Sequence, residues 1–404
     1  MKAQANRARP GSALFCHQEL WHGRSAFRLG NGLAELVTLT GGGHIAEFRF
    51  TGSGGRPTVN PLWTPPWKTT DPFRYRSQVD AARYGPLLEG KLLSGIAGHN
   101  ICLDYFGPPS PEEAEQGLSQ HGEAPSLRWS KISQSVSGGH VTITLSVRLP
   151  AAGLRFHRKI TLRKDQPVVT FRETVQNEKK CDHFFHWVQH VTLGPPFLSS
   201  RETKVSVPGT RGITFPLDYG GGKSLLALGR KFRWPLAPAR SGEPTNLENV
   251  LIRKGAGFVA STLIDPRRDW GYVAALNTQH RLLIGYCFRR EDFPWVAVWE
   301  ENRAIRAVPW QKRTETRGLE FGTTPVPSTR RDTFRQGNLY DTETFVCVPA
   351  CGRKTIEYFA FLAQTPPEVK GIGDVRCTDE EVVVYSNVGK LVARVPNAWK
   401  GSGN

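Results

Sequence analysis

Four short runs between residues 140 and 193 decide the fold of this chain: HVTITLSVRL (140–149), LRFHRKITL (154–162), VVTFRETVQ (168–176) and FHWVQHVTL (185–193). Within each run, apolar side chains alternate with polar ones or follow one another, and Gly, Pro, Asn and Asp gather between the runs. Because successive side chains of a strand point to opposite faces of a sheet, this pattern predicts consecutive antiparallel β-strands.

The same pattern extends over most of the chain. Further strands are expected at 26–39, 44–50, 257–264, 271–276, 281–288, 295–299, 344–348 and 355–362. Helical periodicity is almost absent except at Ser110–Glu115, where an N-cap Ser, a Pro at the first helical position and acidic side chains predict a short helix. The sequence therefore predicts an all-β protein, built as a large antiparallel β-sandwich with few short helices.

No internal repeat and no Pro- or Ser-rich linker divides the 404 residues. Large β-sandwiches often exceed the usual size of a domain, so the length alone does not require two. We expect one sandwich domain over residues 24–365. An N-terminal extension, 1–23, precedes it, and C-terminal strands with a tail, 366–404, pack on the same domain.

The chain is basic, with 53 Lys and Arg against 36 Asp and Glu, a net charge of +17. A concentrated positive charge would favour nucleic acid or a membrane surface as a partner. The basic residues are instead scattered in ones and twos among acidic ones. We therefore expect no nucleic acid and no membrane as partner, while an anionic sugar, such as a sugar phosphate or uronate, stays open as a ligand.

Two further features bear on location and assembly. No apolar run reaches the roughly 20 residues of a membrane helix, and Met1–Leu14 lacks the apolar core of a secretory signal. These features predict a cytoplasmic protein, with export as the alternative if a signal peptide was removed. We expect a monomer or a homodimer.

The cysteines and histidines give little support for a metal site. Seven cysteines are scattered along the chain, and the single C-x3-C pair, Cys347 and Cys351, has no second pair nearby. His186 and His190 would share one face of a strand, but no third ligand is identifiable. We therefore expect free thiols, no metal and no cofactor.

Polar and aromatic residues that a bare core would not need gather in three regions. In the first, His99 and Asn100 follow Gly98, and His121 precedes Gly122. Glycine lets the backbone approach a ligand closely, and imidazole has a pKa suited to proton transfer. In the second, His190 shares a predicted strand face with His186 and Thr192, while Trp187 and Gln189 point to the other face.

The third region combines aromatic rings with carboxylates, as sugar sites do. Trp295 and Trp299 lie on one strand face, where they either form ordinary core or offer a stacking surface, and Glu301 follows them. Glu320 lies in the apolar, Gly-rich segment Gly318–Gly322, where burial would raise the pKa of its carboxyl towards the range of a general base. The alternative is a structural Glu paired with one of the many arginines.

In this order, the three regions resemble the aldose 1-epimerase (galactose mutarotase-like) superfamily. Residues 27–48 are similar to its first hairpin and 153–177 to its central strands. His121-Gly122 resembles the family's His-Gly motif, His190 falls at its strand-borne His, and Glu320 at its late Glu. The resemblance covers about residues 24–363. The family's Asn-Arg dipeptide is replaced by Gly98-His99-Asn100, and its Asn-His strand motif by Gln189-His190, as in a divergent branch.

The resemblance implies a galactose mutarotase-like supersandwich and an enzyme that interconverts sugar anomers without a cofactor. In it, Glu320 would take the proton of the anomeric hydroxyl while His190 donates one to the ring oxygen. His121, His99, Asn100, His186, Gln189 and Glu301 would bind the sugar, and Trp295 or Trp299 would stack on it. Two alternatives share the fold, namely a non-catalytic carbohydrate-binding protein and a polysaccharide lyase or hydrolase.

Overall fold

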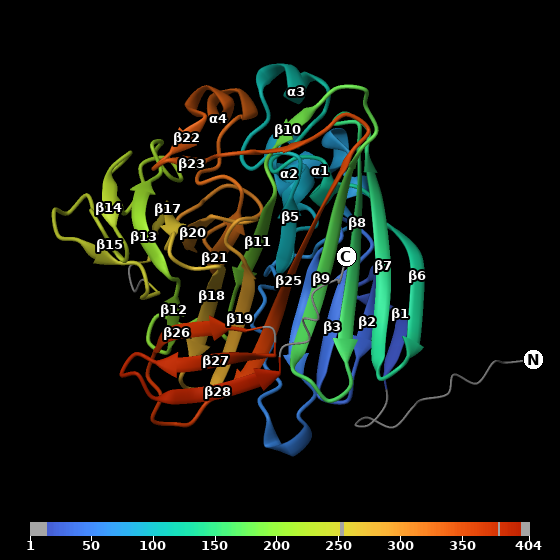
Figure 1. The fold of residues 1–404 in the computed structure, drawn as a ribbon. Coiled ribbons are helices and arrows are strands. Elements are labelled where there is room, and N and C mark those ends of the chain that lie inside the picture. Colours follow the sequence, from blue (N-terminus) through green and yellow to red (C-terminus); the bar gives the residue numbers. More distant parts are fainter. Residues whose placement is uncertain (1–13, 251–253, 379, 397–404) are drawn as a thin grey trace, which may run out of the picture.

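Two large antiparallel sheets stack on one another in the computed structural model, which describes residues 14–250, 254–378 and 380–396 (Figure 1). The larger sheet has thirteen strands. Their order across the sheet is β1 (Phe15–Trp21), β2 (Arg24–Gly30), β3 (Ala34–Leu39), β4 (Ile45–Phe50), β5 (His99–Cys102), β11 (Val188–Leu193), β21 (Glu315–Gly322), β20 (Trp295–Asn302), β17 (Ala256–Ile264), β13 (Gly209–Thr214), β14 (Lys231–Arg233), β15 (Leu236–Ala237) and β16 (Thr245–Asn246).

The second large sheet has eight strands and contains the three runs at 140–176 as neighbours. Its order is β12 (Thr203–Ser206), β18 (Trp270–Asn277), β19 (Leu282–Arg289), β25 (Arg353–Gln364), β9 (Val168–Asn177), β8 (Leu154–Arg163), β7 (His140–Leu149) and β6 (Ser130–Ser137). Alternate apolar side chains of both sheets, such as Phe48 of β4 and Phe156 of β8, fill the space between them. The predicted all-β antiparallel sandwich is confirmed.

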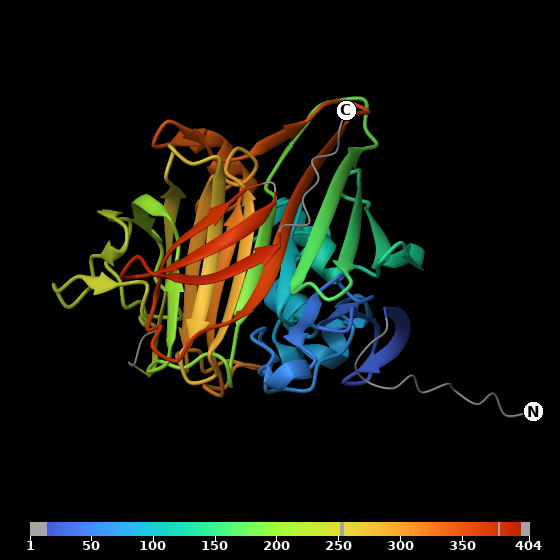
Figure 2. The same ribbon diagram turned by 60° about the horizontal axis from the view of Figure 1, so that its bottom comes forward.

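A three-stranded sheet near the C-terminus covers the outer face of the eight-stranded one (Figure 2). It consists of β26 (Ile372–Cys377), β27 (Glu381–Ser386) and β28 (Leu391–Pro396). Val375, Val382 and Val384 pack with Trp270 and Phe361 in a second apolar cluster. The eight-stranded sheet is therefore buried on both faces over these strands.

Helices are short and lie in connections. They are α1 (Ser77–Tyr84), α2 (Leu87–Leu93), α3 (Pro111–Glu115) and α4 (Arg330–Gln336), with 3₁₀ turns at Ser53–Gly55, Pro72–Arg74 and Ala124–Ser126. Two small ribbons, β10 (His183–Phe185) with β24 (Val346–Val348) and β22 (Asn338–Leu339) with β23 (Thr342–Glu343), complete the described elements. The helix expected at Ser110–Glu115 is confirmed, including the capping box between Ser110 and Glu113.

The N-terminal part differs from the expectation in two places. The single run expected at 26–39 is a hairpin, because Gly32 has φ +90° and the Asn31 side chain accepts hydrogen bonds from the backbone N–H groups of Leu33 and Ala34. Residues 15–21, which we placed in an extension, form the edge strand β1 paired with β2. Exposed and partly buried residues occur on both faces of β1, so its sequence lacks the alternation of a half-buried strand.

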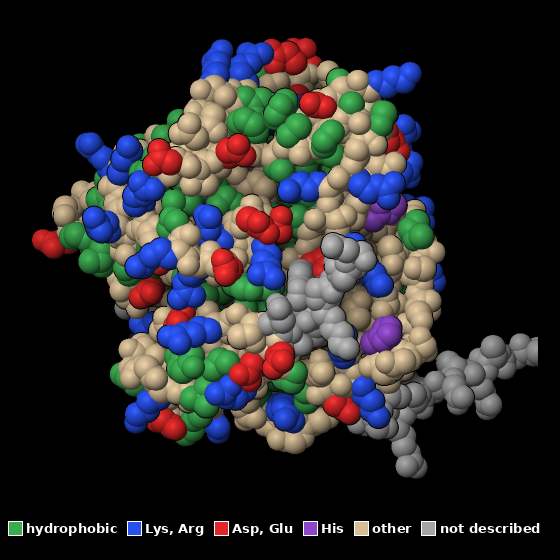
Figure 3. Space-filling view, viewed as in Figure 1, with side chains coloured by type: hydrophobic (Ala, Val, Ile, Leu, Met, Phe, Trp, Pro, Cys, Tyr) green, Lys and Arg blue, Asp and Glu red, His purple; other side chains and the backbone are tan. Residues whose placement is uncertain are grey.

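The surface carries charges of both signs. On the face shown in Figure 3, Lys and Arg side chains are interspersed with Asp and Glu. Many of the arginines form ion pairs; Arg28, for example, contacts Glu19, Glu35 and Glu47. Among the described residues, no helix has the length and apolar character needed to cross a membrane.

Candidate functional site

His190 and Glu320 lie side by side on the face of the thirteen-stranded sheet that points away from the sandwich interior. They are direct partners in the register of β11 and β21. Their neighbours Val191 and Leu319 belong to the core between the sheets. Because side chains alternate along each strand, the strand pairing itself brings the imidazole and the carboxylate to one spot on the outer face.

The two side chains contact each other at the closed end of a cavity. Nε2 of His190 lies 3.3 Å from Oε1 of Glu320, and Nδ1 of His190 hydrogen-bonds with the Thr192 hydroxyl at 3.1 Å. Both groups are nearly excluded from solvent, with exposed side-chain fractions of 6% and 2%. A Cβ atom at Gly318 would collide with Glu320 Oε1, so the glycine leaves the room in which this carboxylate sits.

Burial opposes charge on both members of the pair. It raises the pKa of Glu320 well above the usual carboxyl range and lowers the pKa of His190 to about 4. The form that burial favours is therefore a protonated carboxyl group beside a neutral imidazole. One labile proton is then shared by two groups 3.3 Å apart, which is the equipment of a general acid and base.

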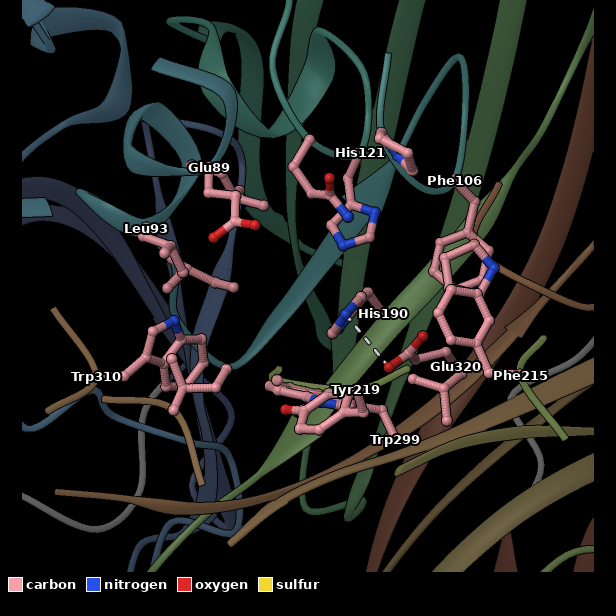
Figure 4. A pocket seen from close by; sticks show the side chains of 18 of the residues that line it. Glu89, Leu93, Phe106, His121, His190, Phe215, Tyr219, Trp299, Trp310 and Glu320 are labelled. Carbon is pink, nitrogen blue, oxygen red and sulfur yellow. Dashed lines mark hydrogen bonds and ion pairs between the residues drawn. The ribbon is translucent and has the colours of Figure 1, made fainter. Parts of the chain in front are cut away.

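A cavity of about 380 Å³ opens in front of the pair (Figure 4). This lies within the range of roughly 300–1,000 Å³ found for small-molecule sites. Its walls come from α2, from the loops that follow β5, β13 and β20, and from β11, β17, β20 and β21. The lining residues are Glu89, Leu92, Leu93, Ile96, Phe106, Pro108, Gln120, His121, His190, Phe215, Asp218, Tyr219, Gly220, Val259, Trp299, Ile305, Trp310, Glu320 and Pro327.

His121 also lines the cavity and lies next to His190 (Figure 4). The centroids of the two imidazole rings are 5.2 Å apart, and Phe106 stacks on the other side of His121. The backbone N–H of Gly107 donates to His121 Nδ1, and burial lowers the pKa of His121 well below its usual value. The neutral ring therefore carries its proton on Nε2, where it can donate to a ligand oxygen.

Trp299 forms one wall and is held by a chain of hydrogen bonds. Its Nε1–H donates to the Tyr219 hydroxyl at 2.9 Å, and that hydroxyl donates to Glu301 at 2.8 Å. The other oxygen of Glu301 accepts the backbone N–H groups of Ala304 and Ile305. Glu301, a predicted ligand-binding residue, thus lies behind the wall and orients Tyr219 and Trp299.

His99 and Gln189 lie on the opposite face, inside the sandwich. His99 Nε2 is 2.9 Å from Gln189 Oε1, and the Gln189 amide donates to Glu173. Arg158, Trp187 and Tyr358 also donate to Glu173, which is completely buried. Gln189 was predicted to point to the strand face opposite to His190, and it does. His99 and Gln189 both belong to a buried polar network behind β11.

Asn100, His186 and Trp295 lie near the site but are not among its lining residues. Asn100 pairs with His190 in the register of β5 and β11, and neither polar atom of its buried amide has a hydrogen-bond partner among the described residues. His186 precedes β11, where the chain changes sheets, so it does not share the strand face of His190 as expected. Trp295 is fully buried and donates to the Glu343 carbonyl.

Several wall residues were not predicted. Phe106, Phe215, Tyr219 and Trp310 come from loops, and Leu93 with Glu89 comes from α2. Loop residues have no periodicity that would assign them a direction, and α2 is a helix of only seven residues that contains Gly90. The aromatic residues in these loops were the one feature of the sequence that could have indicated the cavity wall. No group of three or more potential metal ligands occurs among the described residues.

The fold has clear relatives among solved structures. No family profile and no curated protein matches the sequence. A structure titled "putative aldose 1-epimerase" from Klebsiella pneumoniae superposes with a TM-score of 0.62, covering 86% of this chain and 83% of its own at 14% identity. A galactose mutarotase-like protein from Clostridium acetobutylicum gives 0.57, covering 87% and 99% at 12% identity.

The chain has the galactose mutarotase-like fold. The relation predicted from the sequence is confirmed at this level. A galactose mutarotase related enzyme from Lactobacillus acidophilus gives a TM-score of 0.51, with 84% of this chain and 97% of its own covered at 12% identity. Since identities of 12–14% show only the shape, the chemistry of this galactose mutarotase-like sandwich has to be argued from its own residues.

Proposed function

We propose that this protein is a mutarotase-like enzyme that interconverts the anomers of an aldose. The observation that carries the proposal is the contact between His190 Nε2 and Glu320 Oε1, 3.3 Å apart at the end of a cavity that both residues line. A buried acid and base facing the same ligand-sized space is what ring opening of a cyclic sugar requires.

The reaction moves two protons and breaks one bond. A base removes the proton of the hydroxyl at C1 while an acid protonates the ring oxygen, and the bond between C1 and the ring oxygen breaks to give the open-chain aldehyde. Rotation about the bond between C1 and C2 presents the other face of the carbonyl carbon. The ring hydroxyl then attacks that face, and both protons return.

The shared proton lets the pair serve in both directions. Protonated Glu320 with neutral His190, and ionised Glu320 with protonated His190, are two forms of the same one-proton pair. Ring opening converts one form into the other through the sugar, and ring closure restores it. The resemblance assigned the base to Glu320, whereas burial favours starting with the proton on Glu320 and the free lone pair on His190.

The other polar groups fit the binding of hydroxyls. Nε2–H of His121 is a free donor on the same cavity, and Trp299 and Trp310 offer faces on which the C–H groups of a sugar ring can stack. The described lining contains neither Lys nor Arg, which disfavours sugar phosphates and uronates as substrates. The proposed substrate is therefore an aldose without an anionic group.

The test is an exchange measurement by NMR. Saturation transfer between the α and β anomeric protons is recorded for a panel of aldoses, with the protein, with Glu320→Gln and with Glu368→Gln. Glu368 is exposed, lies in the connection between β25 and β26 and is not among the lining residues, so its substitution controls for the loss of one charge. We expect acceleration that falls by about 10²–10⁴-fold in Glu320→Gln and persists in Glu368→Gln.

Two outcomes would count against the enzyme. If no aldose exchanges faster than in buffer but sugars still bind, the protein is a carbohydrate-binding module on this fold. If Glu320→Gln accelerates exchange as well as the original chain does, the acid–base pair is not the catalyst.

A further inference from the structure

The cavity is acidic in a strongly basic protein. The chain carries a net charge of +17, yet the lining contains three acidic residues, Glu89, Asp218 and the protonated Glu320, and neither Lys nor Arg. A chain with 53 basic residues has placed none of them on this described lining. A negative pocket repels anions and concentrates cations, and this local field opposes that of the surface.

The three carboxylates differ in how they are balanced. Asp218 forms an ion pair with Arg240 at 2.6 Å and accepts the backbone N–H of Gly222. Glu320 Oε1 lies 3.3 Å from His190 Nε2, and burial favours the protonated, uncharged form of this carboxyl group. Glu89 is an exposed residue at the cavity wall and has no ion pair or side-chain hydrogen bond among the described residues, and partial desolvation raises the pKa of its carboxyl. Glu89 is thus the acid of the lining whose charge is left without compensation.

Glu89 and Glu320 reach the cavity from different sides. Figure 4 shows the Glu89 carboxylate directed into the space from α2, and Glu320 with His190 on the far side of that space. Glu320 is 2% exposed, and its Oε1 has no hydrogen-bond partner in the described structure. A ligand that spans the cavity would therefore meet the acid–base pair at one end and an unpaired carboxylate at the other.

The walls between the two ends are aromatic. Phe106, Phe215, Tyr219, Trp299 and Trp310 contribute rings to the lining. The faces of such rings carry partial negative charge, and together with a carboxylate they form the type of box that recognises an ammonium group. The Glu89 carboxylate can also accept hydrogen bonds from neutral sugar hydroxyls. A cationic substituent gains in addition from the opposite charge of Glu89 and from the ring faces.

We propose that the substrate of this site is an amino sugar: an aldose whose anomeric carbon lies at Glu320 and His190 and whose protonated amino group lies at Glu89. The turnover of an amino sugar rests on the proposed function, whereas the binding of its ammonium group at Glu89 does not. N-acetylation of the sugar removes the charge, so the N-acetyl derivative is expected to be a poor ligand. The parent aldose, with a hydroxyl in place of the amino group, is the uncharged ligand of nearly the same shape.

The test compares charged, neutral and acylated sugars. Anomer exchange is measured for aldoses with a free amino group at C2, C3 or C6, for their N-acetyl derivatives, for the parent aldoses and for a hexose 6-phosphate. We expect at least one amino sugar to exchange with a kcat/KM about fivefold or more above its N-acetyl derivative and its parent. Glu89→Gln should remove this preference, and Glu368→Gln should keep it. Equal rates for the charged and acylated sugars, or an unchanged preference in Glu89→Gln, overturn the proposal.

A second measurement separates this proposal from the reaction. Binding of 1,5-anhydro amino sugars, which lack the anomeric hydroxyl and cannot open, is measured by calorimetry against the same variants. If no sugar is turned over but the anhydro amino sugar binds and Glu89→Gln weakens it about fivefold, the mutarotase proposal fails and the ammonium site stands. If the anhydro amino sugar does not bind, or binds Glu89→Gln equally well, the ammonium site is wrong.

Discussion

In the proposed reaction, His190 and Glu320 act in the state in which the two side chains together carry one labile proton. Below the pKa of His190, which burial lowers to about 4, the imidazole gains a second proton and the pair loses its base. Above the pKa of Glu320, which burial raises well above the usual carboxyl range, the pair loses its acid. We therefore expect the activity to fall at low pH, where the base is lost, and at high pH, where the acid is lost, with a plateau between them.

We expect a bell-shaped pH profile of kcat/KM for anomer exchange, with its acidic midpoint near pH 4. Glu320→Gln should abolish the alkaline limb of whatever activity remains, because glutamine does not titrate. The profile is measured by NMR exchange with the uncatalysed rate subtracted at each pH. A single limb with a midpoint near 6.5, the ordinary value for histidine, would contradict the buried pair.

At the scale of a single strand, Gly318 controls the position of the Glu320 carboxylate. The backbone of β21 is ordinary strand at this glycine, but a methyl group there would occupy the place of Glu320 Oε1. The carboxylate is the far end of a flexible side chain and can move away, so the fold should tolerate the change. We expect Gly318→Ala to lower kcat about 10²-fold, since a misplacement of about 1 Å costs that much, with the melting temperature almost unchanged. Unfolding of the variant, or full activity, would show that the glycine has another role.

The strand that carries His190 is anchored from behind by Glu173 of β9. This buried carboxylate accepts hydrogen bonds from Arg158, Trp187, Gln189 and Tyr358. Its removal would leave the buried Arg158 charge unpaired, so Glu173→Ala should lower the free energy of unfolding by about 3–5 kcal/mol. Urea denaturation measures the loss. Glu357→Ala in the neighbouring strand β25 breaks a surface ion pair with Arg172 of β9 and should cost less than about 1 kcal/mol. Equal losses in the two variants would refute the argument.

Strands were predictable where apolar and polar side chains alternate, as in β7, β8 and β9, whose inner face is buried. His190 lies on β11, inside the strand expected at 185–193, whereas β21, which carries Glu320, was not among the expected strands, because Gly318, Glu320 and Gly322 interrupt its apolar pattern. The short strands β13 to β16 and the edge strand β1 carry mixed burial and gave no such signal. Glu89, Tyr219 and Trp310 reach the cavity from a short helix and from loops, whose directions are set by tertiary packing rather than by local periodicity.

For the whole molecule, we propose that the sandwich and the C-terminal three-stranded sheet form one domain. Val375 and Val384 of that sheet share an apolar cluster with Trp270, Phe359 and Phe361 of the eight-stranded sheet. Ending the chain after Gln364 would expose this cluster to water, and exposed apolar patches of that kind promote aggregation.

We therefore expect the full chain to unfold in one calorimetric transition and the chain truncated after Gln364 to aggregate or melt at a lower temperature. Scanning calorimetry and sedimentation compare the two chains at equal concentration. A truncated chain that stays monomeric with the same transition would show that the C-terminal sheet is a separate appendage.

The pairing of β11 with β21 has a consequence for how this scaffold can diversify. The proposed acid and base belong to the hydrogen-bonded ladder of the sheet, whereas most of the walls belong to α2 and to the connections around Tyr219 and Trp310. Chemistry and selectivity are thus encoded in separate stretches of chain. Loop exchange between members of this fold should transfer the preference for a sugar while leaving the proton-transfer machinery in place, which makes the scaffold a suitable host for retargeting by grafting.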